Sequence, residues 1–564
     1  MRVILAGYNI DADLLAELKA LLGEAGKAFK DREDRKDARS KGDLKKLQDF
    51  LSRAMLTPES LSAAYARISR DPRPVPELRH LALGEVEKAR KSNKHIVFGM
   101  GHFSVAEHAV FNFDVLGVSR LAVEALENHR LSSFTEKSQR YIPLEGGYIH
   151  PPEFQGRYLE LFQKLAEKEK SVYLSSYPLL KQYFFASRKD DFPLESRDIA
   201  EKALMENVPL RAKLKEKGLP ADQITRIVDL INSIDGWAKE DARYALGLAT
   251  EAQLGCTVNA RNLEYAVRTF RYHPLAEVRE LGRQLFLKAR EIAPSLIICS
   301  DPEEFEKTFH RPLKDTWFEK GKESMHAAAA EAIQRFGPHG EESPGRETEE
   351  VRLIASDPEG DEKILTAMLQ SASSLDATRC RAIIRHMGES ERLQFFRACL
   401  SELSEFDRLP RAFEETLFTY EIVMSASCFA QMKRHRMMTL LPQAYDPALG
   451  HTLPESVLDA GLEKQFTALF DESASVFLML RKEHPDAAVY ALTNACRRRA
   501  RISVNARELY HISRLREDRH AQWDIRKISE QMLGLAKKAA PLTFLLACGK
   551  DRFLEHKKSV YRDG

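Results

Sequence analysis

The segment AQMKRHRMMT, residues 430–439, concentrates side chains that could bind an anion. Its candidates are Gln431, Arg434, His435 and Arg436, which lie within six residues. On a helix Gln431 and Arg434, three apart, would be neighbours. Arginine offers a planar fork of N–H donors that matches a phosphate or a ring carbonyl. A short basic run is more often a solvated face, so this segment alone does not establish a site.

A second candidate lies in VNARELYHISRLRE, residues 504–517, whose pattern predicts one helix. Its predicted apolar stripe consists of Leu509, Ile512 and Leu515. Arg516 follows Asn505 by eleven residues, about 20° around the helix, and so lies close to this stripe. A guanidinium there is costly unless it has a partner. Arg516 is therefore either a functional cation or a side chain that reaches a carboxylate at the surface.

Both segments have counterparts in the first half of the chain, in the same order. HRLSSFTEKSQRY starts at His129 and matches HRMMTLLPQAYDP at His435, and V-N-A-R occurs twice, around Asn259 and Asn505. Within the first copy His129 and Asn259 are 130 residues apart, whereas within the second copy His435 and Asn505 are 70 apart. Two matches in one order indicate an internal duplication. We assign the additional residues of the first copy to the polar helical stretch 189–220.

The elements that must position these residues recur in each copy. AVFNFDV (109–115) and LFTYEIV (417–423) predict strands, because aromatic and β-branched residues alternate with polar ones. Residues 153–183 and 463–483 repeat apolar side chains at helical spacing. The predicted class is therefore α+β, with more helix than strand.

Composition favours a two-domain soluble protein. The chain has 564 residues, and 43% are hydrophobic and 30% charged. We predict a first domain over 1–335, a Gly- and Pro-containing linker over 336–350, and a second domain over 351–564 that restarts with a strand, turn and helix. The charge run 27–46 is predicted to be a solvated helix or an insertion.

Charge and cysteine usage narrow the class of protein. The net charge is +2, which gives no support to nucleic-acid binding through bulk charge. Seven cysteines form no CxxC pair, which favours reduced thiols in a cytoplasmic setting over disulfides or a zinc site. The start MRVILAGYNIDADLL is too short for a membrane span, does not resemble a signal peptide and predicts a first strand.

The two copies keep different polar residues. The N-terminal copy keeps His102, Ser104, Glu136, Ser138, Arg140 and Arg243. The C-terminal copy keeps Gln431, Arg434, His435, Arg436, Asn505, Arg507, His511 and Arg516. In the N-terminal copy, Ala125, Asn128 and Phe270 replace Gln431, Arg434 and Arg516, and in the C-terminal copy Val489 replaces Arg243. Random loss would be expected to damage both composite sites. Here the losses fall on one of the two, which predicts a single surviving composite site.

Together these motifs resemble the flavin-dependent thymidylate synthase family. The C-terminal half has RHR (434–436) and VNARELYHISRLREDRHAQWDIR (504–526), where the family has V-N-x-R-x-L followed by a late Arg and A-Q-x-E-I-R. The N-terminal half has GHFSVAEH (101–108) and SSFTEKSQRY (132–141), which match the family's G-H-x-[ST]-x-x-E-H element and its loop after R-H-R. The resemblance covers nearly the whole chain as two family-like domains in tandem.

The resemblance implies an architecture and an assembly. Each domain would be an antiparallel sheet flanked by long helices, and the two would form a pseudo-dimer. Family enzymes are homotetramers whose sites lie between subunits, so two copies of this chain would form a homodimer that imitates the tetramer. One active site per chain would combine residues of both halves.

The resemblance also implies the chemistry. NADPH would reduce FAD, and the one-carbon unit of methylenetetrahydrofolate would be transferred to C5 of dUMP to give dTMP. Arg516 would be catalytic, by polarising the uracil ring. Substrate would be bound by Gln431, Arg434, Glu136, Ser138, Arg140 and Arg243. The flavin would be held by His102, Ser104, Glu136, Arg434, His435, Arg436, Asn505, Arg507 and His511. No metal is implied.

Two other functions remain open. The chain could be a catalytically inactive or substrate-shifted relative that binds flavin or a pyrimidine nucleotide, since each copy is degenerate. It could also be a helical nucleic-acid-binding protein that uses CRRRARI (496–502) and KRHR (433–436), although the near-zero net charge disfavours this.

Overall fold

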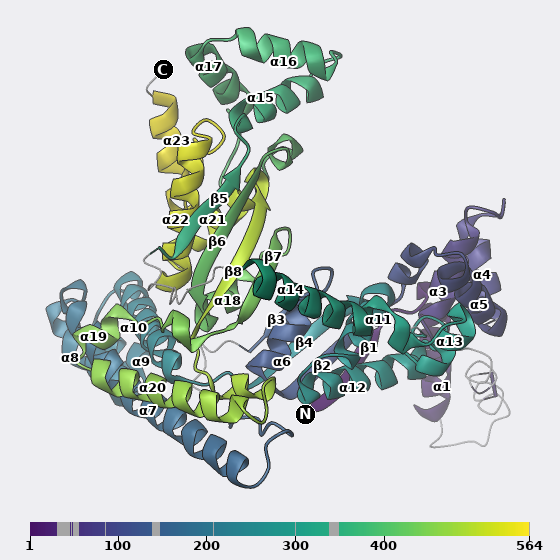
Figure 1. The fold of residues 1–564 in the computed structure, drawn as a ribbon, viewed down its shortest axis with the longest axis horizontal. Coiled ribbons are helices and arrows are strands. Elements are labelled where there is room, and N and C mark those ends of the chain that lie inside the picture. The colour runs from purple at the N-terminus through teal and green to yellow at the C-terminus, as the bar shows by residue number, and fades with distance from the viewer. Residues whose placement is uncertain are drawn as a thin grey trace. The chain divides into compact units, whose positions relative to one another are not determined.

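A computed structural model describes residues 1–30, 45–46, 48, 56–84, 86–137, 147–206, 208–298, 300–337 and 349–562 (Figure 1). Most of the predicted charged segment 27–46 and of the predicted linker 336–350 lies outside these residues. The chain forms two compact units. Unit 1 comprises Met1–Lys137, Gly147–Glu153 and Thr250–Gly340, and unit 2 comprises Ser138–Gly146, Phe154–Ala249 and Glu341–Gly564.

Each unit contains a four-stranded antiparallel sheet with the same strand order. In unit 1 the order is β1-β2-β4-β3, formed by Arg2–Tyr8, Val110–Ser119, Glu251–Asn259 and Ser133–Glu136. In unit 2 it is β5-β6-β8-β7, formed by Val351–Ser356, Leu417–Ser425, Arg497–Asn505 and Thr439–Tyr445. The predicted α+β class and the tandem duplication are confirmed.

The strands form because apolar side chains alternate along them. In unit 2, Phe418 pairs with Val504 and Tyr420 with Ile502 across β6 and β8, and all four side chains are buried. In unit 1, Phe111 of β2 pairs with Val258 of β4 in the same way. One face of each sheet therefore joins a hydrophobic core, as the period of two requires.

The helices of unit 1 lie before, between and after its strands in the sequence. They are α1 (Ala12–Lys30), α3 (Glu59–Arg67), α4 (Val75–Gly84), α5 (Val86–Asn93), α6 (Arg120–Glu127), α11 (Ala260–Arg271), α12 (Ala276–Ile292), α13 (Pro302–Phe309) and α14 (Lys322–Phe336). A 3₁₀ turn over Phe103–His108 carries the GHFSVAEH motif.

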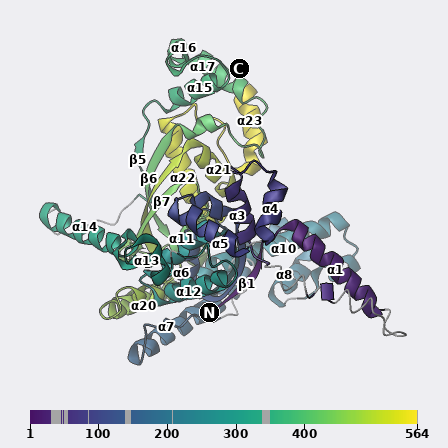
Figure 2. The same ribbon diagram turned by 90° about the vertical axis from the view of Figure 1, so that its right-hand side faces the viewer.

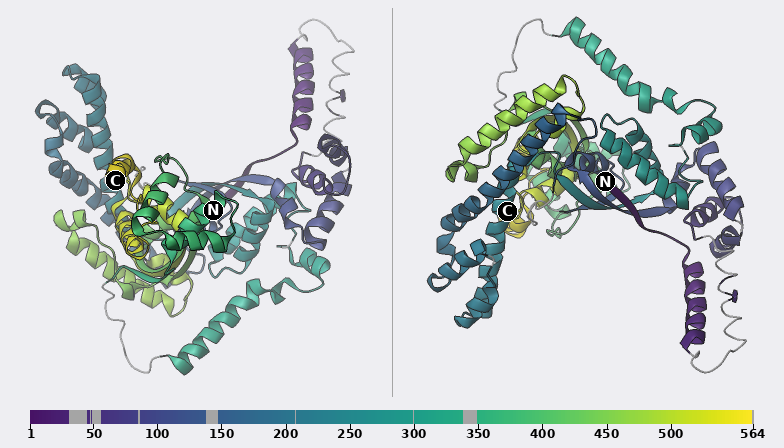
Figure 3. Two further views of the ribbon diagram at one scale, coloured as in Figure 1. Left: turned by 90° about the horizontal axis from the view of Figure 1, so that it is seen from above. Right: turned by 90° about the horizontal axis from the view of Figure 1, so that it is seen from below.

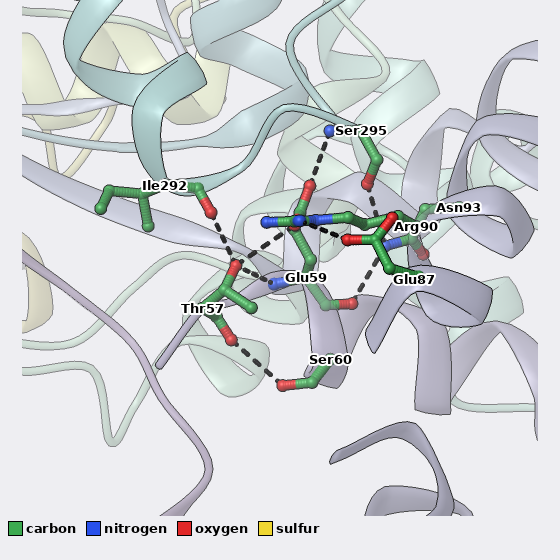
Figure 4. A network of polar contacts seen from close by, with 8 residues as sticks. All are labelled: Thr57, Glu59, Ser60, Glu87, Arg90, Asn93, Ile292 and Ser295. Atoms are coloured by element: carbon green, nitrogen blue, oxygen red, sulfur yellow. Dashed lines mark hydrogen bonds and ion pairs between the residues drawn. The ribbon is translucent and has the colours of Figure 1, made fainter. Parts of the chain in front are cut away.

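A buried carboxylate connects α3 to the C-terminal end of α12 (Figure 4). Glu59 accepts hydrogen bonds from the backbone N–H of Ser295 at 2.6 Å and from Arg90 Nε at 2.7 Å. Thr57 Oγ1 donates to the carbonyl of Ile292 at 2.8 Å. A buried charge is stable when it is paired and hydrogen-bonded in this way, so this network is structural.

Unit 2 combines the C-terminal sheet with helices from both halves of the sequence. From the N-terminal half come α7 (Arg157–Ser187), α8 (Arg197–Glu206), α9 (Leu210–Glu216) and α10 (Ala221–Ala242). From the C-terminal half come α15 (Gly360–Ser371), α16 (Ala377–His386), α17 (Glu389–Cys399), α18 (Ala426–Met432), α19 (Glu455–Asp459), α20 (Glu463–Arg481), α21 (Ala506–Arg516), α22 (Trp523–Ala539) and α23 (Phe553–Arg562). The predicted domain boundaries at 335 and 351 thus remain a prediction about the two sequence repeats.

The long helices α7 and α20, which occupy equivalent places in the two repeats, lie side by side within unit 2 (Figure 3). Gln465 of α20 donates to Ser175 of α7 at 3.1 Å. The segments that follow pair like strands, because Leu248 N donates to Leu492 O at 2.8 Å and Asn494 N donates to Leu246 O at 2.7 Å. The extra residues 189–220 form short helices that share a second hydrophobic core with α7 and α10.

Helices α21 and α22 cover the buried face of the unit 2 sheet and carry its main hydrophobic core (Figure 2). No helix in the described part of the chain is long and apolar enough to cross a membrane.

Candidate functional site

The RHR segment follows helix α18 of unit 2. Ser425 caps this helix, and its Oγ accepts a hydrogen bond from Cys428 N at 2.9 Å. The helix ends at Met432, so Arg434 lies in the turn beyond it. Gln431 and Arg434 are therefore not neighbours on one helix, contrary to the expectation from the sequence. Burial alternates along this turn, because His435 is only 4% exposed while Arg434 and Arg436 are exposed.

Arg516 is the last residue of helix α21, which confirms the predicted helix. Leu509 and Ile512 are fully buried, as predicted. Leu515 is 44% exposed, so its place in the apolar stripe was wrong. It follows Leu509 by six residues, which turns it about 120° around the helix and away from the core.

Neutral groups hold the Arg516 guanidinium. Its Nε donates to His435 Nε2 at 2.8 Å, and its Nη2 donates to the backbone carbonyl of Gln431 at 3.1 Å. Burial lowers the pKa of His435 well below its ordinary value, and the charge of Arg516 lowers it further. These two partners are neutral, and they fix the position of the guanidinium.

The His435 ring has one protonation pattern that fits its neighbours. Because Nε2 accepts from Arg516, the proton of the neutral ring is on Nδ1. Nδ1 faces Glu508 Oε1 at 3.8 Å, and burial raises the pKa of Glu508 to about 7. The ring of His511 meets that of His435 edge-on, with centroids 5.8 Å apart.

A buried hydrogen-bond network leads from Gln431 to a tyrosine of the N-terminal half. Gln431 Nε2 donates to Gln522 Oε1 at 3.0 Å, and Gln522 Nε2 donates to the Tyr244 hydroxyl at 2.9 Å. Tyr244 donates to Asp524 Oδ2 at 2.7 Å, and Ser425 Oγ donates to the same oxygen at 2.5 Å. All five side chains are buried.

Arg243 enters the same unit beside this tyrosine. Its side chain is buried, and its backbone carbonyl accepts from Asn494 Nδ2 at 3.0 Å. Asp241, two residues earlier, accepts hydrogen bonds from Ser456 Oγ at 2.5 Å and Trp523 Nε1 at 2.7 Å. Residues of the N-terminal half are thus built into the C-terminal unit around Gln522 and Asp524.

Two predicted cofactor residues also hold the fold. The Oδ1 of Asn505 accepts from Glu508 N at 2.9 Å and caps α21. Arg507 donates to the Leu409 carbonyl and to Glu414 Oε1, both at 2.8 Å. Hydrogen bonds from Arg411, and then from Arg507, lower the pKa of Glu414. Their role toward a flavin stays a prediction.

Comparison with known proteins bears on both repeats. The family model described as "Thymidylate synthase complementing protein" matches residues 51–295 and 352–542. The chain belongs to this family. Its two matched segments correspond to the two repeats, and together they contain the sheets of both units except β1 and the first residue of β5.

Two similar proteins match most of this chain, and a third matches less than half of it. A UPF0159 protein of Chlamydia muridarum is 24% identical over 81% of this chain and 80% of its own length. A UPF0159 protein of Thermoplasma acidophilum is 22% identical over 86% of this chain and 94% of its own length. A flavin-dependent thymidylate synthase of Clostridium tetani is 25% identical over 43% of this chain and 83% of its own length. The chain is therefore similar to a double-length group and, over about half its length, to the single-length enzymes.

The remaining predicted family residues lie elsewhere. His102 and Ser104 are exposed in unit 1, at and just after the start of the 3₁₀ turn, and Glu136 ends β3 of that unit. Ser138 and Arg140 lie outside the described residues. The structure thus brings together Arg243, Gln431, His435, Asn505, His511 and Arg516 in one unit, with Arg434, Arg436 and Arg507 beside them on the same elements.

Sequence reasoning gave no role to Tyr244, Gln522 or Asp524. The signal for two of them was present, because AQWDIR (521–526) matches the family's A-Q-x-E-I-R. Tyr244 had no signal beyond its position next to Arg243. In the described residues no group of three His, Cys, Asp or Glu side chains could hold a metal ion.

Proposed function

We propose that this chain is a flavin-dependent thymidylate synthase that converts dUMP to dTMP with methylenetetrahydrofolate and NADPH as co-substrates. The proposal combines family membership with the contact between Arg516 and His435 in unit 2, which the first repeat replaces by Phe270 and His129. The relative from Clostridium tetani, named for this activity, supports it.

The observation that carries the proposal is the tethered guanidinium of Arg516. Two neutral acceptors, His435 and the Gln431 carbonyl, hold it in place at 2.8 and 3.1 Å. A fixed cation stabilises a ring that becomes negatively charged, as the uracil ring does when its C5 acts as a nucleophile. Arg516 would therefore stabilise that charge, and His435 would position Arg516.

The residues present fit a phosphate-bearing cofactor. Arg434 and Arg436 are exposed on either side of the buried His435, and guanidinium forks suit a diphosphate such as that of FAD. These two arginines would hold the cofactor, with His511 beside His435. When bound, the flavin supplies the hydride chemistry.

The N-terminal half would contribute further ligands. Arg243 would bind the nucleotide phosphate, and Glu136, Ser138 and Arg140 would bind substrate, as the sequence predicts. His102, Ser104, Asn505 and Arg507 would contact the flavin. Two chains would form a homodimer.

The test is to purify the protein, reconstitute it with FAD and assay dTMP formation from dUMP by chromatography. We expect flavin absorbance and turnover in the wild type. Arg516→Ala should lower kcat by about 10²–10³-fold, the usual loss when one charge-stabilising group is removed. Arg271→Ala is the matched control, because Arg271 lies in the last turn of α11, next to the equivalent residue Phe270.

The outcomes separate the alternatives. A colourless protein that cannot take up FAD contradicts the proposal. A protein that binds FAD and dUMP but forms no dTMP is the inactive relative. Equal activity of Arg516→Ala and Arg271→Ala would remove Arg516 from the mechanism.

A further inference from the structure

The hydrogen-bond network around Tyr244 has a direction. Asp524 Oδ2 accepts from both Tyr244 and Ser425, so the tyrosine hydroxyl gives its only proton to the carboxylate. Burial and the neighbouring Asp524 raise the pKa of Tyr244 well above its ordinary value, so the hydroxyl stays protonated. The tyrosine oxygen can then only accept from Gln522.

This direction fixes two amides in turn. Gln522 must direct its NH₂ group to Tyr244, so its carbonyl oxygen faces Gln431. Gln431 must then give its own NH₂ group to that oxygen. Its carbonyl oxygen, Oε1, therefore points the other way, where it is buried and accepts no hydrogen bond from the described residues.

We infer that Tyr244 is a positioning residue, which through Gln522 makes Gln431 present a hydrogen-bond acceptor, and that this acceptor selects a uracil ring over a cytosine ring. The inference rests on the proposed function, because it assumes that the site takes a pyrimidine nucleotide. It adds to the family assignment that Tyr244, through Gln522, determines which end of the Gln431 amide is left to accept a hydrogen bond.

The chemistry of the two bases explains the selection. Uracil presents an N3–H donor between two carbonyl acceptors, so its N3–H complements the acceptor of Gln431. Cytosine has an unprotonated N3, which would place an acceptor against Gln431 Oε1. A site built for a donor rejects a ligand that lacks it, because the buried polar group is left unpaired.

The surroundings of Tyr244 hold it rigidly. The Trp523 ring stacks on it, with centroids 5.7 Å apart and 21° between planes. Trp523 is held in turn by Asp241, at 2.7 Å from its Nε1. The network therefore couples the segment Asp241–Tyr244 of the N-terminal half to the start of α22.

Both repeats have a buried tyrosine at this position, so the tyrosine alone does not provide the oriented acceptor. Tyr490 stands at the equivalent position, fifteen residues before Asn505 as Tyr244 is before Asn259, and it is also fully buried. In the first repeat, however, Ala125 and Leu275 replace the two glutamines, Leu275 being the cap of α12 as Gln522 is of α22. Tyr490→Phe is thus a matched control for Tyr244→Phe.

The experiment measures Kd for dUMP and for dCMP by calorimetry on the FAD-loaded protein. We expect the wild type to prefer dUMP by about 10²-fold or more. Tyr244→Phe should lower this ratio about tenfold or more, because both amides are then free to turn. Gln522→Leu, which introduces the residue of the first repeat, should have the same effect, and Tyr490→Phe should leave the ratio unchanged.

Each result has one meaning. An unchanged ratio in Tyr244→Phe and Gln522→Leu overturns the inference, even if their melting temperatures fall, because the residues would then be only structural. If Tyr244→Phe does not fold, Gln522→Leu alone decides. Preserved selection against dCMP that Tyr244→Phe abolishes, without any dTMP formation, supports the inference while the proposed synthase activity fails. A wild type that binds neither nucleotide overturns both.

Discussion

The first repeat surrounds its histidine with an aromatic ring, and the second surrounds the equivalent histidine with a cation. The rings of His129 and Phe270 meet edge-on with centroids 5.2 Å apart, and burial lowers the pKa of His129 to about 4. His435 instead accepts a hydrogen bond from Arg516, which stands at the position of Phe270. The contact between histidine and helix is kept, and only its chemistry differs.

Three neighbouring positions differ in the same sense. Ala125, Asn262 and Leu275 of the first repeat correspond to Gln431, Glu508 and Gln522 of the second. Polar or ionisable groups that gather around His435 are thus replaced by small, neutral or apolar ones around His129. The replacements are compatible with a stable core, which explains how one repeat could lose its site without losing its fold.

Other residues are kept in both repeats, and each holds an element in place. Asn259 and Asn505 cap equivalent helices. Ser119 and Ser425 do the same and also donate to a carboxylate at the second residue of the next long helix, Glu277 or Asp524. Asn and Ser at these positions therefore serve the fold of both repeats, whereas Gln431 and Arg516 have polar side chains in the second repeat only.

After the loss of Arg516 itself, the largest effect should come from replacing each of the two histidines with phenylalanine. His435→Phe keeps a ring of similar size but removes the acceptor of Arg516 Nε, so we expect kcat for dTMP formation to fall about 10–100-fold as Arg516 loses its alignment. His129→Phe keeps an aromatic ring between Tyr265 and Phe270 and should change kcat less than about twofold. Steady-state kinetics of both variants measures the difference. Equal losses would mean that the two histidines have the same role.

An intermediate effect is expected at Glu508, whose counterpart is Asn262. Burial raises the Glu508 pKa to about 7 from 4.5, so the folded chain binds this proton more tightly than the unfolded chain. The stability linked to this proton is present below about pH 4.5 and is lost as the pH rises to about 7. Glu508→Asn should therefore gain stability relative to the wild type above pH 7, by up to about 3 kcal/mol.

Urea unfolding at about pH 5 and about pH 8 measures this change. The difference between wild type and Glu508→Asn should be larger at the higher pH. An equal difference at both pH values would show that Glu508 titrates normally.

The smallest effect should come from an ion pair that both repeats keep. Arg507 pairs with Glu414 at 2.8 Å and Arg261 with Glu107 at 2.5 Å. Arg507→Ala should cost about 1 kcal/mol of unfolding free energy, because Arg507 also donates to the Leu409 carbonyl. Arg261→Ala, with a side chain 49% exposed, should cost about 0.5 kcal/mol or less.

Thermal unfolding of the two variants gives the comparison, and flavin absorbance of the same samples tests the predicted cofactor role of Arg507. The reverse order of stability would contradict the geometry. Loss of flavin from Arg507→Ala alone would give that residue a function in addition to its structural pair.

Much of the fold could be read from the sequence because it depends on local patterns. The duplication, the strands at 109–115 and 417–423, the long helices and the helix that carries Arg516 all follow from periodicity and repetition. The end of α18 before Arg434 and the exposure of Leu515 could not be read as reliably, since helix ends and stripe edges depend on tertiary packing.

The contacts within the site could not be predicted from the sequence, because they join residues that are far apart in the chain. His435 and Arg516 are 81 residues apart, and Tyr244 and Asp524 are 280 apart, so their hydrogen bonds follow from packing that no local pattern encodes. The motif gave residue types, but not that Arg516 is held by an imidazole or that Gln431 has a fixed orientation.

The strand-like pairing of residues 246–248 with 492–494 has a consequence for how this chain evolves. Two separate subunits would pair through such segments only at sufficient concentration. If the subunits were identical, each would also need every residue of the site. Here the partners are tethered, so the effective concentration of one for the other is high at any dilution. Each copy is then free to specialise, because every chain always brings its own complement.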